Sequence, residues 1–248
     1  MVKEERFQLI LEHLAKENKV ELGSMSTVLS VSEDTVRRDI KELHEQGLLQ
    51  AVRGGAISSF SVPHHYRDRE KYETGQKKRI AEKAVTFIKN GQTIFMDGGT
   101  SVLAVAEMLP KDLKVTVVTN SFPVANVLED HPNAEVIFAG GRLYKTAFTT
   151  IGHETINTIK NVRANLYFMG ISSLNTSGIT GKSYEDVQVK KFMAEMSAQV
   201  IALSTLAKIN TTQSFYICPV TNVNAIITEA APTSPELKAY HKLGIQIL

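Results

Sequence analysis

The chain has 248 residues, which is enough for one small domain joined to one larger α/β domain. Hydrophobic residues make up 43% and charged residues 22% of the sequence, as in soluble globular proteins, which excludes a disordered or fibrous chain. The formal net charge of +2 excludes a uniformly basic protein that binds any phosphate polymer through bulk charge.

Several features of the sequence predict a cytosolic protein. The only cysteine, Cys218, cannot form a disulfide within the chain, which fits a reducing compartment. The first residues carry charges of both signs and no apolar stretch, so we expect no signal peptide, and no apolar run is long enough to span a bilayer. Cys218 precedes Pro219, and we expect it to be a packed small residue rather than a nucleophile.

Apolar spacing predicts two helices at the start of the chain. The first has apolar residues at i, i+3, i+4 and i+7, which are Phe7, Ile10, Leu11 and Leu14. The second covers about residues 21–29. Its expected inward-facing residues are Leu22, Met25, Val28 and Leu29.

A third helix follows a tight turn over residues 30–32. Ser32 suits the N-cap of this helix, and acidic residues follow in its first turn, where the helix dipole favours them. We expect the helix to run to about Glu45 and to end at Gly47 as the C′ residue. Residues 48–52 then read as a strand, 53–55 as a hairpin tip and 56–57 as the returning strand, which predicts a winged helix-turn-helix that ends near residue 58.

One face of the third helix carries the features of a DNA-reading surface. Val36, Ile40 and Leu43 form its buried stripe, and the basic side chains lie roughly opposite. The candidate contacts on this face, at the helix start and on the wing are Ser32, Thr35, Arg37, Arg38, Lys41 and Arg53. The alternative is a solvated charged face, because residues 1–57 hold eight basic and ten acidic residues, a net −2.

Residues 59–75 read as a linker, because serine, proline and alternating charges replace any periodic pattern. Two histidines, His64 and His65, are expected to be solvated rather than metal-binding, since they have no nearby partner ligands. Basic residues of this segment and the start of the next helix, such as Arg69 and Lys77, supply much of the excess positive charge.

From residue 76 to residue 248, short β-rich runs alternate with helical stretches, which predicts an open, parallel α/β sheet. The expected strands are residues 93–97, 115–119, 135–139, 166–170, 200–203, 225–228 and 245–248. The expected helices are residues 78–89, 102–109, 123–129, 186–198 and 235–243.

Three successive strands end in polar or glycine-rich segments: residues 97–101, 119–121 and 140–142. In an open α/β sheet, ligands bind beyond the carboxyl ends of the strands, and the first segment also opens a helix whose free N–H groups favour an anion. The segment is neither a Walker A loop nor a dinucleotide fingerprint. The pattern therefore predicts a crevice for a small phosphorylated molecule, with ordinary turn-forming residues as the alternative.

The segment from Val31 to Leu43 (VSEDTVRRDIKEL), the following Gly47 and Leu48, and the RGGA sequence at Arg53 resemble the DeoR family of bacterial transcription regulators. The resemblance extends over nearly the whole chain. It implies operator binding by a homodimer or homotetramer, usually to repress sugar-utilisation genes. It also implies a sensor domain that shares its fold with ribose-5-phosphate isomerase, belongs to the isomerase and CoA-transferase scaffold, and binds a phosphorylated sugar.

By this resemblance the effector contacts are Asp97, Gly98, Gly99, Thr100, Ser101, Asn120, Ser121, Gly141, Arg142, Glu185, Lys190 and Lys208. Each has a structural alternative: Glu185 and Lys190 could lie on a solvated helix surface, and Lys208 in an exposed loop.

The sequence departs from the family twice. Ile171, Ser172 and Ser173 stand where an aspartate is common, and residues 205–210 read TLAKIN where the family has an Asp-Ser-Ser-Lys-Phe-Gly segment, which puts the identity of the sugar in doubt.

The rival hypothesis is a sugar-phosphate isomerase-like or transferase-like enzyme with a regulatory DNA-binding domain. An aldose–ketose isomerase needs a positioned carboxylate base, yet serines follow Gly170 and only single acids, Asp97 and Glu185, are candidates. We therefore expect no catalytic residues, no metal and no cofactor. The sequence predicts a cytoplasmic repressor of carbohydrate genes, controlled by a sugar phosphate and not associated with a membrane.

Overall fold

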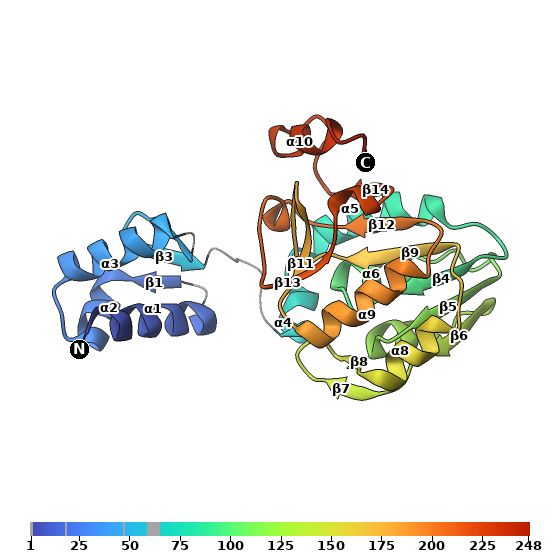
Figure 1. The fold of residues 1–248 in the computed structure, drawn as a ribbon, viewed down its shortest axis with the longest axis horizontal. Helices are drawn as coiled ribbons and strands as arrows, with labels where there is room; N and C mark the ends of the chain where they lie inside the picture. Colours follow the sequence, from blue (N-terminus) through green and yellow to red (C-terminus); the bar gives the residue numbers. More distant parts are fainter. Residues whose placement is uncertain (1, 18, 47, 59–64) are drawn as a thin grey trace. The chain divides into compact units, whose positions relative to one another are not determined.

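The computed structural model describes residues 2–17, 19–46, 48–58 and 65–248 (Figure 1). The chain divides into two compact units, Met1–His64 and His65–Leu248, called here the N-terminal unit and the C-terminal unit. Among the described residues, no helix is both long and apolar enough to cross a membrane.

The N-terminal unit contains the predicted winged helix-turn-helix. Its elements are α1 (Lys3–Glu17), β1 (Lys19–Glu21), α2 (Leu22–Leu29), α3 (Glu33–Glu45), β2 (Leu49–Val52) and β3 (Gly55–Ser58). The strands form an antiparallel sheet in the order β1-β3-β2. Strand β1 was not predicted, because three residues are too few to show an alternating pattern.

The predicted inward faces of the first two helices are correct except at Val28. Ile10 and Leu14 of α1, and Met25 and Leu29 of α2, are buried in one core. Val28 is 47% exposed. On a helical wheel it lies about 60° beyond the stripe that the buried residues of α2 already fill.

The turn between α2 and α3 has the predicted tight geometry. Ser30 adopts a left-handed conformation with φ 53°, and the N–H of Val31 donates to the carbonyl of Ser26 at 3.1 Å, which closes the C-terminus of α2. The Ser32 hydroxyl accepts from the N–H of Thr35 at 3.3 Å, so Ser32 is the N-cap of α3, as predicted. Gly47, the predicted C′ residue, lies outside the described residues.

The wing has a shorter tip than the sequence predicts. Val52 pairs with Gly55, so the loop holds only Arg53 and Gly54, and Gly54 has φ 91°. Gly55 belongs to β3, where a Cβ atom would lie 2.0 Å from the carbonyl oxygen of Val20 in β1. This close approach of two strands, rather than a turn, requires a glycine there.

Part of the predicted linker is folded. Residues 66–71 form α4 (Tyr66–Lys71), and α5 (Thr74–Ala84) begins before residue 76. Tyr66 is 3% exposed and packs into the C-terminal unit. One buried ring in six residues produces no periodicity, which explains why the helix was missed. His65 occupies the N-cap position of α4, and His64 lies outside the described residues; no metal-binding cluster of His, Cys, Asp or Glu is found among the residues described.

The C-terminal unit is built on a seven-stranded parallel sheet in the order β15-β14-β12-β9-β4-β5-β6 (Figure 1). Its strands are β4 (Thr93–Met96), β5 (Val115–Thr119), β6 (Ala134–Phe138), β9 (Leu166–Gly170), β12 (Val200–Leu203), β14 (Ala225–Ile227) and β15 (Gln246–Ile247). These are the seven strands that the sequence predicts, with small shifts at their ends. The open α/β fold class is confirmed.

Helices cover both faces of this sheet. The pleat of β4 sends Phe95 into one core cluster and Ile94 and Met96 into the other. The face of Ile94 and Met96 is covered by α5, α6 (Thr100–Glu107) and α7 (Phe122–Leu128). The opposite face is covered by α8 (His153–Lys160), α9 (Tyr184–Glu195) and α10 (Lys238–His241).

The remaining elements are short and include several that the sequence did not predict. The short strands are β7 (Arg142–Tyr144), β8 (Thr149–Ile151), β10 (Ser173–Asn175), β11 (Gly178–Gly181) and β13 (Phe215–Cys218). Single turns of 3₁₀ helix are η1 (Val85–Phe87), η2 (Leu206–Lys208), η3 (Val220–Asn222) and η4 (Pro235–Leu237).

Cys218 is buried among apolar residues, and burial raises the pKa of its thiol to about 11, as suits a packed rather than a reactive cysteine.

Candidate functional site

The face of α3 that the sequence assigns to DNA is exposed, and the opposite face holds the helix in place. Val36, Ile40 and Leu43 are buried. Asp39 is also buried, and its carboxylate accepts from the guanidinium of Arg6 on α1 at 2.6 Å. This ion pair fixes α3 against α1 and keeps the Asp39 charge off the exposed face.

The exposed basic residues of α3 are held only by acids on the same helix. Arg37 pairs with Asp34, and Lys41 lies 3.9 Å from Glu45. Arg38 on α3 and Arg53 on the wing are exposed. Because such solvated pairs are worth at most about 1 kcal/mol, the basic side chains can turn toward a phosphate or a base.

Near the helix start, the Ser32 hydroxyl lies 3.0 Å from that of Thr35. Both hydroxyls are therefore positioned beside the N-terminus of α3, as predicted.

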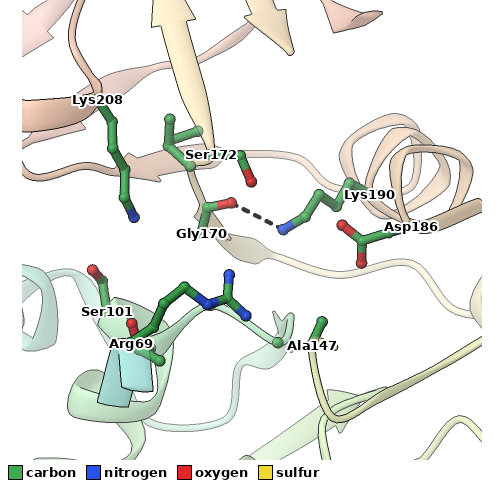
Figure 2. A pocket seen from close by; sticks show the side chains of 12 residues that line it. Arg69, Ser101, Ala147, Gly170, Ser172, Asp186, Lys190 and Lys208 are labelled. Carbon is green, nitrogen blue, oxygen red and sulfur yellow. Dashed lines mark hydrogen bonds between the residues drawn. The ribbon is translucent and has the colours of Figure 1, made fainter. Parts of the chain in front are cut away.

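Asp97, at the end of β4, is the most highly connected side chain of the C-terminal unit. It is 1% exposed, and its carboxylate accepts from the N–H of Gly99 at 2.9 Å, the hydroxyl of Tyr167 at 2.7 Å and the ammonium of Lys190 at 2.5 Å. It also accepts from the N–H of Gly170 at 3.0 Å. Lys190 in turn donates to the carbonyl of Gly170 at 2.9 Å (Figure 2). Asp97 therefore joins β4, β9 and α9.

Glycines allow the ends of β4 and β9 to approach closely. A Cβ atom on Gly99 would lie 2.8 Å from the Cα atom of Gly170, and one on Gly98 would lie 2.0 Å from the methyl group of Thr149. A side chain at Gly99 would push the ends of β4 and β9 apart, and one at Gly98 would clash with Thr149 on β8. The glycine pair that the sequence places in a ligand loop therefore has a packing role as well.

A narrow pocket of about 30 Å³ opens at the N-terminus of α6 (Figure 2), and we call it the α6 pocket. Six predicted effector residues line it: Gly98, Gly99, Thr100, Ser101, Lys190 and Lys208. Six residues that the sequence did not assign also line it: Arg69, Ala147, Gly170, Ile171, Ser172 and Asp186. The pocket thus draws on α4, α6, the 146–148 loop, α9, η2 and the ends of β4 and β9.

The α6 pocket presents hydrogen-bond donors that have no acceptor. Ser101 is 2% exposed and its hydroxyl has no partner, and the same holds for Nε and Nη2 of Arg69. The first backbone bond into α6 is from the N–H of Leu103 to the carbonyl of Gly99, which leaves the preceding amides of the helix to face the pocket. Buried donors without acceptors are costly unless a ligand satisfies them.

The charges around the α6 pocket shift the pKa values of its ionisable groups. Burial, reinforced by the nearby Arg69 cation, lowers the pKa of Lys208 to about 7. Burial also lowers the pKa of Arg69 and raises that of Asp186, the only acid on the lining. Desolvation is the largest cause of all three shifts, so the pocket is a poorly solvated site that disfavours uncompensated charge.

Four other predicted effector residues lie away from the α6 pocket. Asn120 donates to the carbonyl of Thr150 at 2.7 Å, and Ser121 is the N-cap of α7. Arg142 and Glu185 form an exposed ion pair. The strand order explains the difference. The pocket lies at the ends of the neighbouring strands β4 and β9, whereas Asn120, Ser121 and Arg142 follow β5 and β6 on the other side of β4.

Gly141 also lies outside the pocket lining. It has φ 145°, and a Cβ atom on it would lie 2.9 Å from the carbonyl oxygen of Ile151 on β8 and 2.4 Å from the hydroxyl oxygen of Thr155 on α8. Buried Asp97 is the sixth predicted effector residue that is not on the lining. The structure therefore does not bring the three strand ends into one crevice. The sequence left open that Glu185 and Lys190 lie on a solvated helix surface and Lys208 in an exposed loop. Glu185 does lie on an exposed helix surface. Lys190 is instead buried at 5% exposure, and Lys208 lines the pocket half-buried.

The two departures from the family pattern fall in and beside the α6 pocket. Ser172 lines it directly. The hydroxyls of Ser173 and Thr205 are fully buried and have no hydrogen-bond partner. Ser172, Ser173 and Thr205 carry no charge, so they do not neutralise the cations of the pocket.

Comparisons with known proteins match both units. Residues 6–62 match the DeoR-like helix-turn-helix domain, and residues 72–230 match the DeoR C-terminal sensor domain. The chain is 30% identical to the HTH-type transcriptional repressor GlcR of Bacillus subtilis, over 100% of this chain and 96% of that protein. It is 32% identical to the glycerol-3-phosphate regulon repressor of Escherichia coli, over 94% of this chain and 93% of that protein.

Among solved structures, ribose 5-phosphate isomerase A from Neisseria gonorrhoeae aligns with a TM-score of 0.40 and 20% identity, over 53% of this chain and 52% of that chain. At this score the fold assignment rests on the strand order alone. The two family models match in chain order, and the relatives match over nearly their full length as named repressors. This chain therefore belongs to the DeoR family, and it is a DNA-binding transcription regulator rather than an isomerase or a transferase.

Proposed function

We propose that the chain represses genes of carbohydrate metabolism, and that a small phosphorylated sugar bound in the α6 pocket controls its binding to operator DNA. The N-terminal unit would bind the operator through α3 and the wing. The C-terminal unit would bind the effector without a further cofactor.

The unsatisfied donors of the α6 pocket carry this proposal. A phosphate group at the N-terminus of α6 would accept from the free amides, from the Ser101 hydroxyl and from the Arg69 guanidinium. Lys208 would supply a further positive charge at the same site. The hydroxyl oxygens of a neutral sugar could accept from some of these donors, but they would not neutralise the charges of Arg69 and Lys208.

The exposed face of α3 supports the DNA-binding half of the proposal. Ser32 and Thr35 lie at the helix start, which reaches base edges in helix-turn-helix proteins, and Arg37, Arg38 and Lys41 follow along the helix. The unit as a whole is mildly acidic, so its affinity must come from these few residues rather than from bulk charge.

The assembly and location are part of the same proposal. Helix-turn-helix proteins bind paired half-sites with two-fold symmetry, which supports a homodimer or a homotetramer. A regulator that binds chromosomal operators acts in the cytoplasm. The relatives named as repressors support the sign of regulation.

A ligand panel tests the effector. Glycerol 3-phosphate, glucose 6-phosphate, fructose 1-phosphate and ribose 5-phosphate would each be added to the full chain, with glycerol and the unphosphorylated sugars as matched controls. We expect at least one phosphorylated compound, and none of the controls, to raise the melting temperature of the C-terminal unit. Equal effects of a sugar and its phosphate would contradict the phosphate site.

A further inference from the structure

One charged group of the α6 pocket comes from the segment that precedes the sheet along the chain. Arg69 lies on α4, the first element of the C-terminal unit in chain order. Helix α4 has only six residues, and an isolated helix of this length is not stable in water. Its conformation therefore depends on its contacts with the rest of the unit.

Two contacts hold the ends of α4. At its start, Tyr66 is buried and its N–H donates to the carbonyl of Thr146 at 2.9 Å. At its end, the buried ammonium of Lys77 on α5 donates to the carbonyls of Arg69 and Tyr72. The first bond satisfies an N–H group of the first turn of α4, and the other two place a cation at the carbonyls of its C-terminal end.

The side chain of Arg69 points from α4 into the α6 pocket, near Ser101 and Ala147 (Figure 2). Its guanidinium lies 5.9 Å from the ring centre of Tyr66, yet Nε and Nη2 are buried without an acceptor. Leaving a charged donor buried and unpaired costs more than leaving a neutral one. The described residues thus supply no acceptor through which the Arg69 side chain could hold α4 in place.

An anion at the N-terminus of α6 would supply that contact. A phosphate oxygen can accept from the α6 amides and, on another edge, from the planar fork of a guanidinium. The competing acid on the lining, Asp186, is on α9 and makes no hydrogen bond with Arg69 in the described structure. The bound anion would therefore bridge α6 and α4.

We propose that Arg69 binds the anionic group of the effector and that filling the pocket thereby stabilises α4, the element that joins the C-terminal unit to the DNA-binding unit along the chain. This inference rests on the proposed function and adds the route of regulation to it. Because the effector can contact Arg69 in this way only when α4 is folded against the C-terminal unit, it favours that state, and this is the differential interaction that a change of state requires.

Hydrogen exchange of the full chain tests this route, with inorganic phosphate as the probe and sodium chloride at matched ionic strength as the reference. In the wild-type chain, phosphate is expected to slow exchange at the first amides of α6, residues 100–102, and in residues 66–73. In Arg69→Gln, phosphate is expected to slow exchange only at residues 100–102, and the protection of residues 66–73 to fall by about tenfold. Arg67→Gln, an exposed arginine on the same helix, is the matched control and is expected to behave as wild type.

The outcomes separate this inference from the proposed function. Protection of α6 without protection of residues 66–73 in the wild type, or equal protection in Arg69→Gln, overturns the role of Arg69 and leaves the phosphate site standing. No protection at either segment contradicts both. Arg69→Lys keeps the charge but loses the planar fork, and it is expected to give intermediate protection. A melting curve of each variant in the absence of phosphate shows that the fold is retained.

Discussion

The two units of this chain hold their functional cations in opposite ways. In the N-terminal unit, Arg37 and Lys41 are solvated and pair only with acids one helical turn away. In the C-terminal unit, Lys190 is buried in an ion pair with Asp97, and Arg69 has buried nitrogens without an acceptor. The solvated cations of the N-terminal unit cost little free energy of desolvation. The buried cations of the C-terminal unit are desolvated, so their free energy depends on the groups that the surrounding fold places around them.

This difference suits the two partners. DNA is a large polyanion that meets a surface, so exposed and mobile side chains are adequate. A small phosphorylated molecule has to be enclosed, and the donors that meet it must be held in place before it arrives. Substitutions should therefore affect stability mainly in the C-terminal unit and affinity mainly in the N-terminal unit.

The largest expected effect is on stability. Replacing Lys190 with methionine leaves the buried carboxylate of Asp97 without its charge partner and should destabilise the C-terminal unit by about 3–5 kcal/mol. The matched control is Glu185→Gln, which removes one partner of the exposed pair with Arg142 and should cost less than about 1 kcal/mol. Urea unfolding followed by circular dichroism measures both. Similar losses in the two variants would contradict the contrast between the buried and the exposed pair.

The next effect is on DNA binding. Arg38→Ala or Arg37→Ala should weaken operator binding by about 1–3 kcal/mol if the side chain reads a base, without a change in stability. Arg37 should give the smaller loss, because it must first leave Asp34. Gel titration measures the affinity, and Lys19→Gln, an exposed cation outside the α3 face, serves as the control. Unchanged operator binding in both arginine variants would contradict the assignment of α3 as the DNA-contacting helix.

A third effect concerns the pH dependence of effector binding. Burial lowers the pKa of Lys208 to about 7, and a bound phosphate would raise this pKa. Binding above pH 7 should therefore take up a proton, and affinity should fall by about tenfold between pH 7 and pH 9 as Lys208 loses its charge. Calorimetry in buffers of different ionisation enthalpy measures the proton uptake. Lys208→Gln should abolish it, and the same uptake in that variant would assign the proton to another group.

The smallest effect concerns the turn of the N-terminal unit. Ser30 has φ 53°, a conformation that glycine adopts without steric cost. Ser30→Gly should therefore stabilise this unit by about 0.5–1 kcal/mol. Ser26→Gly, in the interior of α2, should have the opposite sign because glycine disfavours helix. Hydrogen exchange of α2 and α3 reports both changes, and destabilisation by Ser30→Gly would show that the hydroxyl has a role of its own.

Much of the fold could be predicted from the sequence because its signals are local. The apolar stripe of α3 and the β-rich runs of the parallel sheet are visible in consecutive residues. Helix α4 and strand β1 could not be predicted, because one buried ring and three residues make no period. Their structure depends on tertiary contacts, which sequence periodicity does not report.

The α6 pocket could be predicted only in part. The strand–glycine–helix pattern at Asp97 locates its floor, but periodicity cannot tell which neighbouring strand ends beside it. The strand order places the end of β9 there and moves Asn120 and Arg142 away. Arg69 was missed as a pocket residue because its segment looked like a linker; the only signal was that a tyrosine stood three residues before it.

The most direct test of the account is a titration of the full chain with DNA from its own promoter, with and without the sugar phosphate that stabilises the C-terminal unit, in wild type, Arg69→Gln and Arg38→Ala. The account predicts that the sugar phosphate changes the DNA affinity of the wild type, that Arg69→Gln binds DNA but does not respond, and that Arg38→Ala binds DNA poorly. A sugar phosphate that binds the chain yet leaves the DNA affinity of the wild type unchanged would contradict it.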